Sequence, residues 1–163
     1  MSGRSRRQVD ELSQLGRIRL DDRRRVTGSG GLSVGPDRHQ IELDGRKFWT
    51  WCAYDVVGIF GALRASGEAR SASPFSGTAL EVHFRDGRPL APQLVLFRPD
   101  EADLACCSSV YDDWCPNSNF FESEDAAWIW SRGRGLQGRV LTLDEAAKLA
   151  TREWGQLTGG LRI

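Results

Sequence analysis

Two reactive side chains, the thiol of Cys52 and the carboxyl group of Asp55, stand three residues apart in a strongly apolar segment. Apolar residues recur through positions 49–63 at the three- and four-residue spacing of a helix face, which predicts a helix. Side chains three residues apart lie on the same face of a helix, so the thiol and the carboxyl group can share a pocket. Because apolar surroundings disfavour a charged carboxylate, we expect a raised pKa for Asp55 and a proton available for transfer.

The same spacing is also compatible with a purely structural role. Cysteine is among the residue types most often buried, and Asp55 could do no more than cap a neighbouring segment by hydrogen bonding. Taken alone, the spacing of Cys52 and Asp55 is therefore weak evidence for a catalytic pair.

Three further cysteines gather in residues 99–121, a long polar connection. They are Cys106, Cys107 and Cys115. Ordered connections of this length within compact domains are usually functional, and thiolates select soft metals. A structural zinc site is disfavoured, because neither His39 nor His83 stands at a zinc-ligand spacing.

The two histidines also bear on nucleophilic catalysis. A cysteine nucleophile needs a base that is close in space, but His39 and His83 fall on predicted strands and are better interpreted as surface or hydrogen-bonded sheet residues. A thioredoxin-like mechanism lacks its Cys-x-x-Cys pair. Neither mechanism therefore explains the cysteines well.

Two sequence motifs carry a resemblance to a known family. Residues 48–55, FWTWCAYD, resemble the active-site segment of organomercurial (alkylmercury) lyases, in which a Trp-Cys-Ala-x-Asp pattern supplies one thiol and the acid. Residues 114–123, WCPNSNFFES, resemble the second motif of that family, with Cys115 in the place of its second essential thiol. A weaker resemblance runs from about residue 41 to residue 157, so it covers most of the chain.

The resemblance implies a function, namely protonolysis of carbon–mercury bonds to give a hydrocarbon and Hg(II). Cys52 and Cys115 would bind the soft mercury ion, and Asp55 would deliver a proton to the carbon as general acid. No organic cofactor is required, and Hg(II) is the bound product. Small cytosolic thiols or, by the same resemblance, a mercuric reductase would then remove it.

Further residues are candidates for supporting roles. Cys106 and Cys107 could serve as accessory thiols that pass mercury in or out, although ordinary loop residues are an equal alternative. Aromatic side chains could form apolar walls that receive the organic group, although core packing is the simpler interpretation for most of them. The aromatic candidates for this wall are Trp51, Tyr54, Trp114 and Phe120.

The sequence also departs from the family pattern. Family members commonly carry an N-terminal winged-helix-like domain, which we expect to be missing or truncated here. Pro116, Asn117 and Asn119 stand where His or Val is usual beside the second cysteine. Two alternatives therefore stay open: a non-catalytic protein that binds Hg or Cu, and a divergent enzyme that uses the same Cys/Asp/Cys site on another substrate. The retained Asp55 favours an enzyme, because a pure metal binder needs no proton donor.

The expected elements make an α+β fold, with a mixed or antiparallel sheet packed with helices, because strands and helices do not alternate as βαβ units. Residues 1–30 are rich in arginine and end in glycines, which indicates a flexible arm with one short helix near residues 9–15. Residues 31–163 are interpreted as the alkylmercury-lyase-like catalytic domain. Residues 78–85 and 93–97 are expected to pair as a hairpin.

Capping signals predict two more helices. Ser123 can cap a helix that runs through Trp130. Thr142 and Glu145 have the spacing of a capping box, which predicts a last helix to about Leu157.

Composition limits the possible partners and location. The 163 residues include 22 basic and 22 acidic side chains, which argues against the broad basic surface that nucleic-acid binding needs. No apolar run reaches the ~20 residues that span a bilayer, and no hydrophobic stretch follows the N-terminal arginines. We therefore expect a cytoplasmic protein with no membrane partner, whose cysteines stay reduced.

Overall fold

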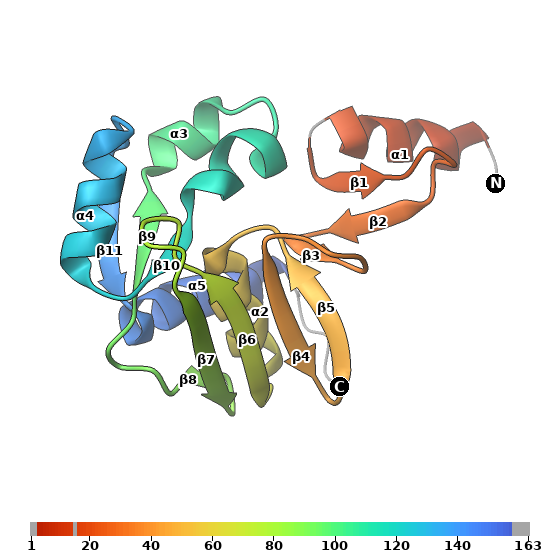
Figure 1. Ribbon diagram of the computed structural model, residues 1–163. Coiled ribbons are helices and arrows are strands. Elements are labelled where there is room, and N and C mark those ends of the chain that lie inside the picture. The colour runs from red at the N-terminus through yellow and green to blue at the C-terminus, as the bar shows by residue number, and fades with distance from the viewer. Residues whose placement is uncertain (1–2, 15, 158–163) are drawn as a thin grey trace.

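The computed structural model describes residues 3–14 and 16–157, which form two sheets packed with helices (Figure 1). The larger sheet has eight strands in the order β1-β2-β3-β5-β4-β6-β7-β8, and the smaller has three in the order β10-β9-β11. All strand pairs of these two sheets are antiparallel. The α+β class expected from the sequence is therefore confirmed.

One face of the larger sheet contacts the core. In β7, Leu80, Val82 and Phe84 are buried whereas their neighbours are exposed, which is the period of two of a half-buried strand. The strands of this sheet are β1 (Ile18–Leu20), β2 (Val26–Ser29), β3 (Leu32–Ser33), β4 (His39–Leu43), β5 (Arg46–Thr50), β6 (Gly67–Ala72), β7 (Ala79–Arg85) and β8 (Arg88–Pro89).

The smaller sheet places β9 (Val95–Pro99) between β10 (Asn119–Phe121) and β11 (Gly138–Thr142). The hairpin expected from residues 78–85 and 93–97 is wrong, because β7 pairs with β8 and β9 pairs with β10 and β11. Four of the five residues of β9 are buried, which is typical of a central strand rather than of a hairpin partner at an edge.

Helix α4 (Glu124–Gly133) covers the smaller sheet, where its residues Ala126 and Ala127 pack against Phe97 and Phe121. The predicted cap is confirmed, since the backbone N–H of Ala126 donates to Ser123 Oγ at 3.1 Å.

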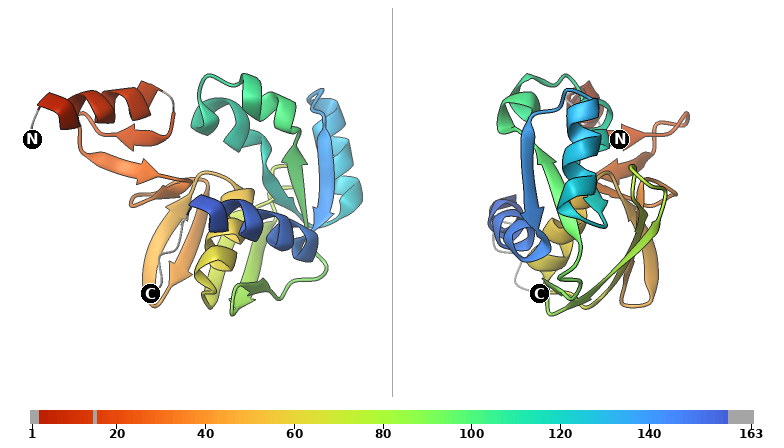
Figure 2. Two further views of the ribbon diagram at one scale, coloured as in Figure 1. Left: turned by 180° about the vertical axis from the view of Figure 1, so that it is seen from behind. Right: turned by 60° about the vertical axis from the view of Figure 1, so that its left-hand side comes forward.

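Helices α2 (Ala53–Leu63) and α5 (Leu143–Leu157) pack against each other beside the larger sheet (Figure 2). A Cβ atom added at Gly58 would lie 2.7 Å from the Trp154 ring, so glycine permits this close approach of the helices. The predicted capping box of α5 is confirmed: the backbone N–H of Thr142 donates to Glu145 Oε2 at 2.9 Å, and that of Glu145 donates to Thr142 Oγ1 at 3.3 Å.

Helix α2 begins later than the sequence predicts. Trp49 and Thr50 belong to β5, where they pair with β3 and β4. Aromatic and β-branched side chains suit a strand, and sheet pairing overrides the helical spacing. As a result Cys52 is the N-cap of α2 and not a residue inside the helix.

The segment interpreted as a flexible arm contains regular structure where it is described. Helix α1 (Gly3–Gln14) covers and extends the predicted short helix, although position 15 lies outside the described residues. Strand β1 pairs with β2, and β2 pairs with β3, so this segment continues the larger sheet. The structure thus has strands β1 and β2 where the sequence indicates an arm with one short helix. The division of the chain into an arm and a catalytic domain stays a prediction.

Residues 100–118 connect β9 to β10 through α3 (Glu101–Cys106) and two short turns of helix, η1 (Val110–Trp114) and η2 (Cys115–Asn117). Asp113 orders this connection, because its Oδ2 accepts hydrogen bonds from the backbone N–H groups of Ser108 at 3.0 Å and Ser109 at 2.9 Å. The connection lies at the same end of the molecule as β1 and α1 (Figure 1). Within residues 3–14 and 16–157, no helix has the length and apolar character required to cross a membrane.

Candidate active site

Cys52, Asp55 and Cys115 meet in the interior of the protein. One sulfur or carboxylate oxygen from each residue lies within 4.8 Å of the others. The residues are 0%, 5% and 1% exposed, respectively, and both thiols are free. The structure therefore brings together the two distant thiols and the acid that the sequence singles out.

The start of α2 holds Cys52 and Asp55 side by side. Cys52 is the N-cap residue, and Asp55 occupies the third helical position. The backbone N–H of Cys52 donates to Asp55 Oδ2 at 3.1 Å, and the backbone N–H of Asp55 donates to Cys52 Sγ at 3.4 Å. This is a capping box in which sulfur replaces the usual hydroxyl oxygen. Asp55 thus has the structural capping role considered for it, and the same hydrogen bonds fix its carboxyl group beside the thiol.

Backbone hydrogen bonds join the segment of Cys115 to the start of α2. The N–H of Ser118 donates to the carbonyl oxygen of Cys115 at 3.2 Å, and the N–H of Ala53 donates to that of Ser118 at 3.0 Å. Ala53 follows Cys52 directly. The second sequence motif is therefore bonded to the first through Ser118, and this bonding sets the position of one thiol relative to the other.

Burial controls the protonation of the cluster. Removal from water raises the pKa of Asp55 to about 7, against the opposing effects of its hydrogen bonds to Cys52 and of the charge on Arg38. Burial also raises the pKa of the Cys52 thiol well above its usual value, and the nearby Cys115 and Asp55 add to the effect. The direction agrees with the raised pKa expected from the apolar segment, and a carboxyl group of this kind can hold a proton near neutral pH.

Gly31 contacts the carboxyl group of Asp55, and sequence reasoning does not find it. A Cβ atom at Gly31 would lie less than 3.0 Å from Cγ and both oxygens of Asp55, and the φ angle of +84° also favours glycine. The backbone N–H of Trp51 donates to the carbonyl oxygen of Gly31 at 2.9 Å, which fixes this approach. The run Gly30-Gly31 is a visible signal, but it predicts only a turn.

A cavity of about 270 Å³ borders Asp55 and Cys115. Trp51, Tyr54 and Trp114 line this cavity, whereas Phe120 is not among its lining residues. Phe120 is fully buried and its ring centroid lies 5.8 Å from that of His39, because β10 directs this side chain into the core. The remaining wall includes parts of residues 16–31, the connection, β9 and α5.

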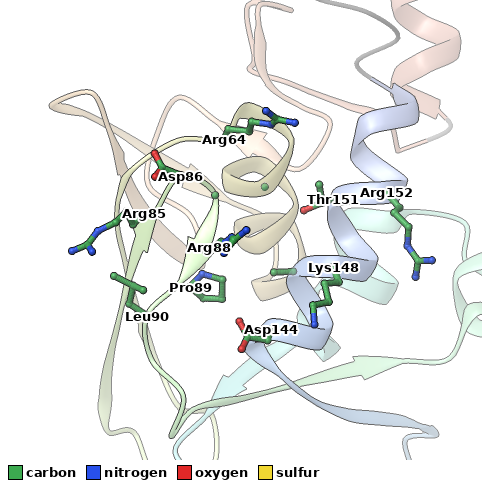
Figure 3. Close-up of a pocket in the computed structure, with 13 residues that line it drawn as sticks. Arg64, Arg85, Asp86, Arg88, Pro89, Leu90, Asp144, Lys148, Thr151 and Arg152 are labelled. Carbon is green, nitrogen blue, oxygen red and sulfur yellow. The ribbon is translucent and has the colours of Figure 1, made fainter.

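A larger hollow of about 1490 Å³ lies between the end of α2, the β7–β8 turn and α5 (Figure 3). Many of its side chains are charged, including Arg64, Arg88, Lys148 and Arg152, and its described lining residues include no cysteine. By volume alone, this hollow would be the candidate for the active site. The cavity of about 270 Å³ is the better candidate, because it borders the thiol of Cys115 and the carboxyl group of Asp55.

Tyr111 connects residues 99–121 to the N-terminal strands. The guanidinium groups of Arg19 and Arg38 lie 4.0 and 4.3 Å from the centroid of its ring, and its hydroxyl donates to Asp37 Oδ1 at 3.1 Å. Arg38 also donates to the carbonyl oxygen of Trp51 at 3.1 Å, immediately before Cys52. Sequence reasoning misses these residues because no local spacing reveals contacts between such distant segments.

Cys106 and Cys107 lie outside the buried cluster. Cys106 is exposed, and Cys107 is half-buried with its Sγ donating to the carbonyl oxygen of Leu104 at 3.1 Å. Both line a separate cavity of about 520 Å³, which shares Trp114 with the cavity at Asp55. Burial and the charge of Asp113 raise the pKa of Cys107.

The histidines take no part in the cluster, as the sequence indicates. His39 is buried in β4, its Nδ1 lies 2.7 Å from Ser71 Oγ, and burial lowers its pKa to about 4. His83 lies on the exposed face of β7, where its Nε2 is 3.4 Å from Glu81 Oε1.

Fold and site together define a class: an α+β protein with a buried cysteine–carboxyl–cysteine group of the kind suited to soft metal ions. The sequence model of one family, described as alkylmercury lyase, matches residues 32–155. The chain belongs to the alkylmercury lyase family.

Individual relatives agree with this assignment. The alkylmercury lyase of Staphylococcus epidermidis is 31% identical over 152 residues, which cover 86% of this chain and 66% of that protein. The alkylmercury lyase of Bacillus cereus is 26% identical over 143 residues, which cover 85% of this chain and 62% of that protein. The chain thus spans slightly less than two thirds of the length of these relatives.

A solved structure described as the mercury-bound form of MerB2 shares the fold. Its TM-score is 0.82 at 24% sequence identity, and the match covers 96% of this chain and 76% of that one.

Proposed function

We propose that this chain is an organomercurial lyase, which cleaves carbon–mercury bonds by protonolysis and releases a hydrocarbon and Hg(II). The observation that carries the proposal is the convergence of the Cys52 and Cys115 thiols with the Asp55 carboxyl group. Membership of the alkylmercury lyase family supports it. The same proposal includes a role in detoxification of organic mercury in the cytoplasm.

The reaction starts with thiol exchange at mercury. The substrate R–Hg–X exchanges X for a protein thiolate, and the thiol proton leaves as HX. The second thiol then adds to mercury, and its proton passes to Asp55, which lies beside Cys52. Two sulfur ligands suit a soft cation far better than oxygen ligands do. They increase the electron density on the carbon that is bonded to mercury.

Protonation of that carbon completes the reaction. Asp55 gives its proton to the carbon as the carbon–mercury bond breaks, so R–H leaves and Hg(II) stays on Cys52 and Cys115. The protons balance, because two thiols lose two protons, one to HX and one to R–H. A carboxyl group with a pKa of about 7 can both accept and deliver a proton near neutral pH.

The protonation of Asp55 also separates this function from metal storage. A protein that only binds Hg or Cu gains nothing from a buried carboxyl group whose pKa burial raises to about 7. In an enzyme of this mechanism the same group is the proton donor.

Benzene release from phenylmercury, with the reduced protein and an excess of a small thiol, tests the proposal. We expect release by the wild type and loss of release in Cys52→Ser, Cys115→Ser and Asp55→Asn. Asp55→Asn should still bind Hg(II), because both thiols remain. Asp144→Asn is the matched control, since Asp144 is exposed and lines the distant hollow of Figure 3.

Two results would contradict the proposal. Undiminished benzene release in both cysteine variants would remove the thiol mechanism. Tight Hg(II) binding by the wild type without benzene release would identify a metal-binding protein or an enzyme for another substrate.

We further propose that Cys107, with Cys106, helps Hg(II) to leave the buried site. Cys107 and Cys115 line two cavities that share Trp114 as a lining residue. The thiolate of Cys107 would form a bond to mercury as the bond from Cys115 breaks, and Cys115 would take up the proton that Cys107 loses. Small thiols, or a mercuric reductase, would then accept Hg(II) from the exposed side.

The release rate of preloaded Hg(II) to glutathione tests this role. Cys106→Ser with Cys107→Ser should slow release severalfold and leave single-turnover benzene formation unchanged. Equal release rates in this double variant and the wild type would assign both residues to the loop structure alone.

A further inference from the structure

Arg98 is a buried cation next to the candidate active site. It lies on β9, is 3% exposed, and lines the same cavity as Asp55 and Cys115. Its guanidinium group lies 4.8 Å from the centroid of the Tyr54 ring and 5.9 Å from that of Trp114. Arg98 thus lies against the residue that precedes Asp55, which is Tyr54, and against the residue that precedes Cys115, which is Trp114. Nothing in the proposed protonolysis uses this charge.

The hydrogen bonds of Arg98 are incomplete. Its Nη2 donates to Glu101 Oε1 and Glu153 Oε1 over long distances of 3.4 and 3.5 Å. Its buried Nε has no hydrogen-bond partner among the described residues. A buried N–H without an acceptor is costly, and Nε and Nη2 share one edge of the guanidinium group. That edge is the one to which a carboxylate binds through two parallel hydrogen bonds.

The charge of the cavity wall agrees with an anionic ligand. Arg17 and Arg98 are the two basic residues of the described wall, and Glu153 and Asp55 are the acidic ones. Arg98 forms ion pairs with Glu153 and with Glu101, which is not a lining residue of the cavity, whereas Arg17 has no ion-pair partner among the described residues. Glu153 is also partly engaged elsewhere, because it accepts a hydrogen bond from the Tyr54 hydroxyl at 3.0 Å.

We propose that Arg98, assisted by Arg17, selects organomercurials whose organic group carries a carboxylate. The inference rests on the proposed lyase function and names the substrate class for that site. The mercury atom would lie at Cys115 and Cys52, the aromatic residues would contact the organic group, and the carboxylate would meet the guanidinium edge. The cavity of about 270 Å³ accepts a single aromatic ring of this kind.

Two substrates that differ only by a ring carboxylate test the inference. They are phenylmercury and 4-mercuribenzoate, whose organic products are benzene and benzoic acid. We expect the wild type to favour 4-mercuribenzoate in kcat/KM by roughly tenfold, the scale of a charge-assisted hydrogen-bonded pair. Arg98→Gln should bring the ratio close to one, Arg98→Lys should keep part of it, and Arg17→Gln should reduce it by a smaller factor.

The ratio is measured within each variant, so a general loss of activity from disturbed packing cancels. Arg88→Gln is the matched control, because Arg88 is an exposed residue that lines the hollow of Figure 3 and not the cavity at Asp55, so it should leave the ratio unchanged. A ratio in Arg98→Gln equal to that of the wild type would overturn the inference. So would a wild type that does not prefer the carboxylate.

A binding measurement separates this inference from the lyase function. By calorimetry, benzoate should bind the wild type and bind Arg98→Gln at least fivefold more weakly, whereas the neutral benzamide should bind both equally. If neither mercury compound is cleaved by the wild type, the lyase function fails, and weaker binding of benzoate by Arg98→Gln still supports the anion site. Equal binding of benzoate by the two proteins rejects the anion site, whatever the result with mercury.

Discussion

Replacing Gly31 by alanine should slow protonolysis about 100-fold and leave Hg(II) binding intact. A Cβ atom at this position would lie 2.3 Å from Cγ and Oδ1 of Asp55, whereas non-bonded carbon atoms pack at ~3.5–4.0 Å. The carboxyl group must therefore move by about 1 Å, a misplacement that can lower a reaction rate by ~100-fold. The carbonyl oxygen of Cys52 still accepts from the N–H of Val56, and that of Cys115 still accepts from the N–H of Ser118, so the two sulfur ligands of mercury remain in place.

Gly30 provides a matched control for this substitution. Its φ angle is +57° and that of Gly31 is +84°, so alanine is strained at both positions. A Cβ atom at Gly30 meets nothing within 4 Å. Both substitutions should therefore cost about 1–2 kcal/mol of unfolding free energy through the backbone, and only Gly31→Ala should lose activity.

Three measurements on each variant decide the matter: single-turnover benzene release from phenylmercury, the stoichiometry of Hg(II) binding, and urea unfolding. We expect Gly30→Ala to release benzene at the wild-type rate. A folded Gly31→Ala protein that releases benzene within about twofold of Gly30→Ala would refute the assignment of Asp55 as proton donor.

Three further predictions concern protonation and capping. Because burial raises the pKa of Asp55 to about 7, single-turnover cleavage should fall up to about tenfold for each pH unit above that value, as a rapid-quench pH profile would show. A raised carboxyl pKa stabilises the folded state at low pH and loses this effect as pH rises toward 7, whereas the lowered pKa of His39, about 4, acts in the opposite direction. As the pH is lowered from about 6.5 to 4.5, the unfolding free energy of Asp55→Asn, measured in urea titrations, should therefore fall by roughly 2 kcal/mol relative to that of the wild type. An equal pH dependence of the two unfolding free energies would contradict the raised pKa of Asp55. Thr142→Ala removes the N-terminal capping interaction of α5 and should lower the unfolding free energy by about 1 kcal/mol, with Ser76→Ala, at an exposed turn, as the comparison.

Local signals in the sequence predict the parts of this fold that depend on neighbouring residues. The caps at Ser123 and Thr142 need partners only three residues away, and the structure has both. The alternation of β7 is likewise a local property of one strand. The start of α2 is not a local property, because Trp49 fits the apolar spacing of a helix but is also, like Thr50, a residue type that suits a strand. Their pairing with β3 and β4 decides the outcome, and that pairing lies outside any local window.

The residues of the site also divide into those that local sequence signals reveal and those that only long-range contacts reveal. Cys52, Asp55 and Cys115 can be named from two motifs, since each motif contains a reactive residue in a short, distinctive sequence. Gly31, Arg98 and Tyr111 cannot, because their meaning comes from contacts with residues far along the chain. Gly31 matters only because its backbone meets Asp55, and Arg98 only because β9 passes beside the cavity. Composition alone assigns the N-terminal segment to a solvated arm. In the structure, contacts with distant parts of the chain make residues 16–31 part of the cavity wall.

The identity of residue 52 is better explained by chemistry than by stability. An N-cap position favours Ser, Thr, Asp or Asn, whose oxygen atoms accept strong hydrogen bonds from the first turn. Here a thiol accepts from the N–H of Asp55 at 3.4 Å, with a sulfur atom that is a weak acceptor. The capping box would form at least as well with serine, so the helix does not require sulfur at this position. A site for a soft metal ion does require sulfur, and Cys52 lies beside a second thiol and a carboxyl group whose pKa burial raises.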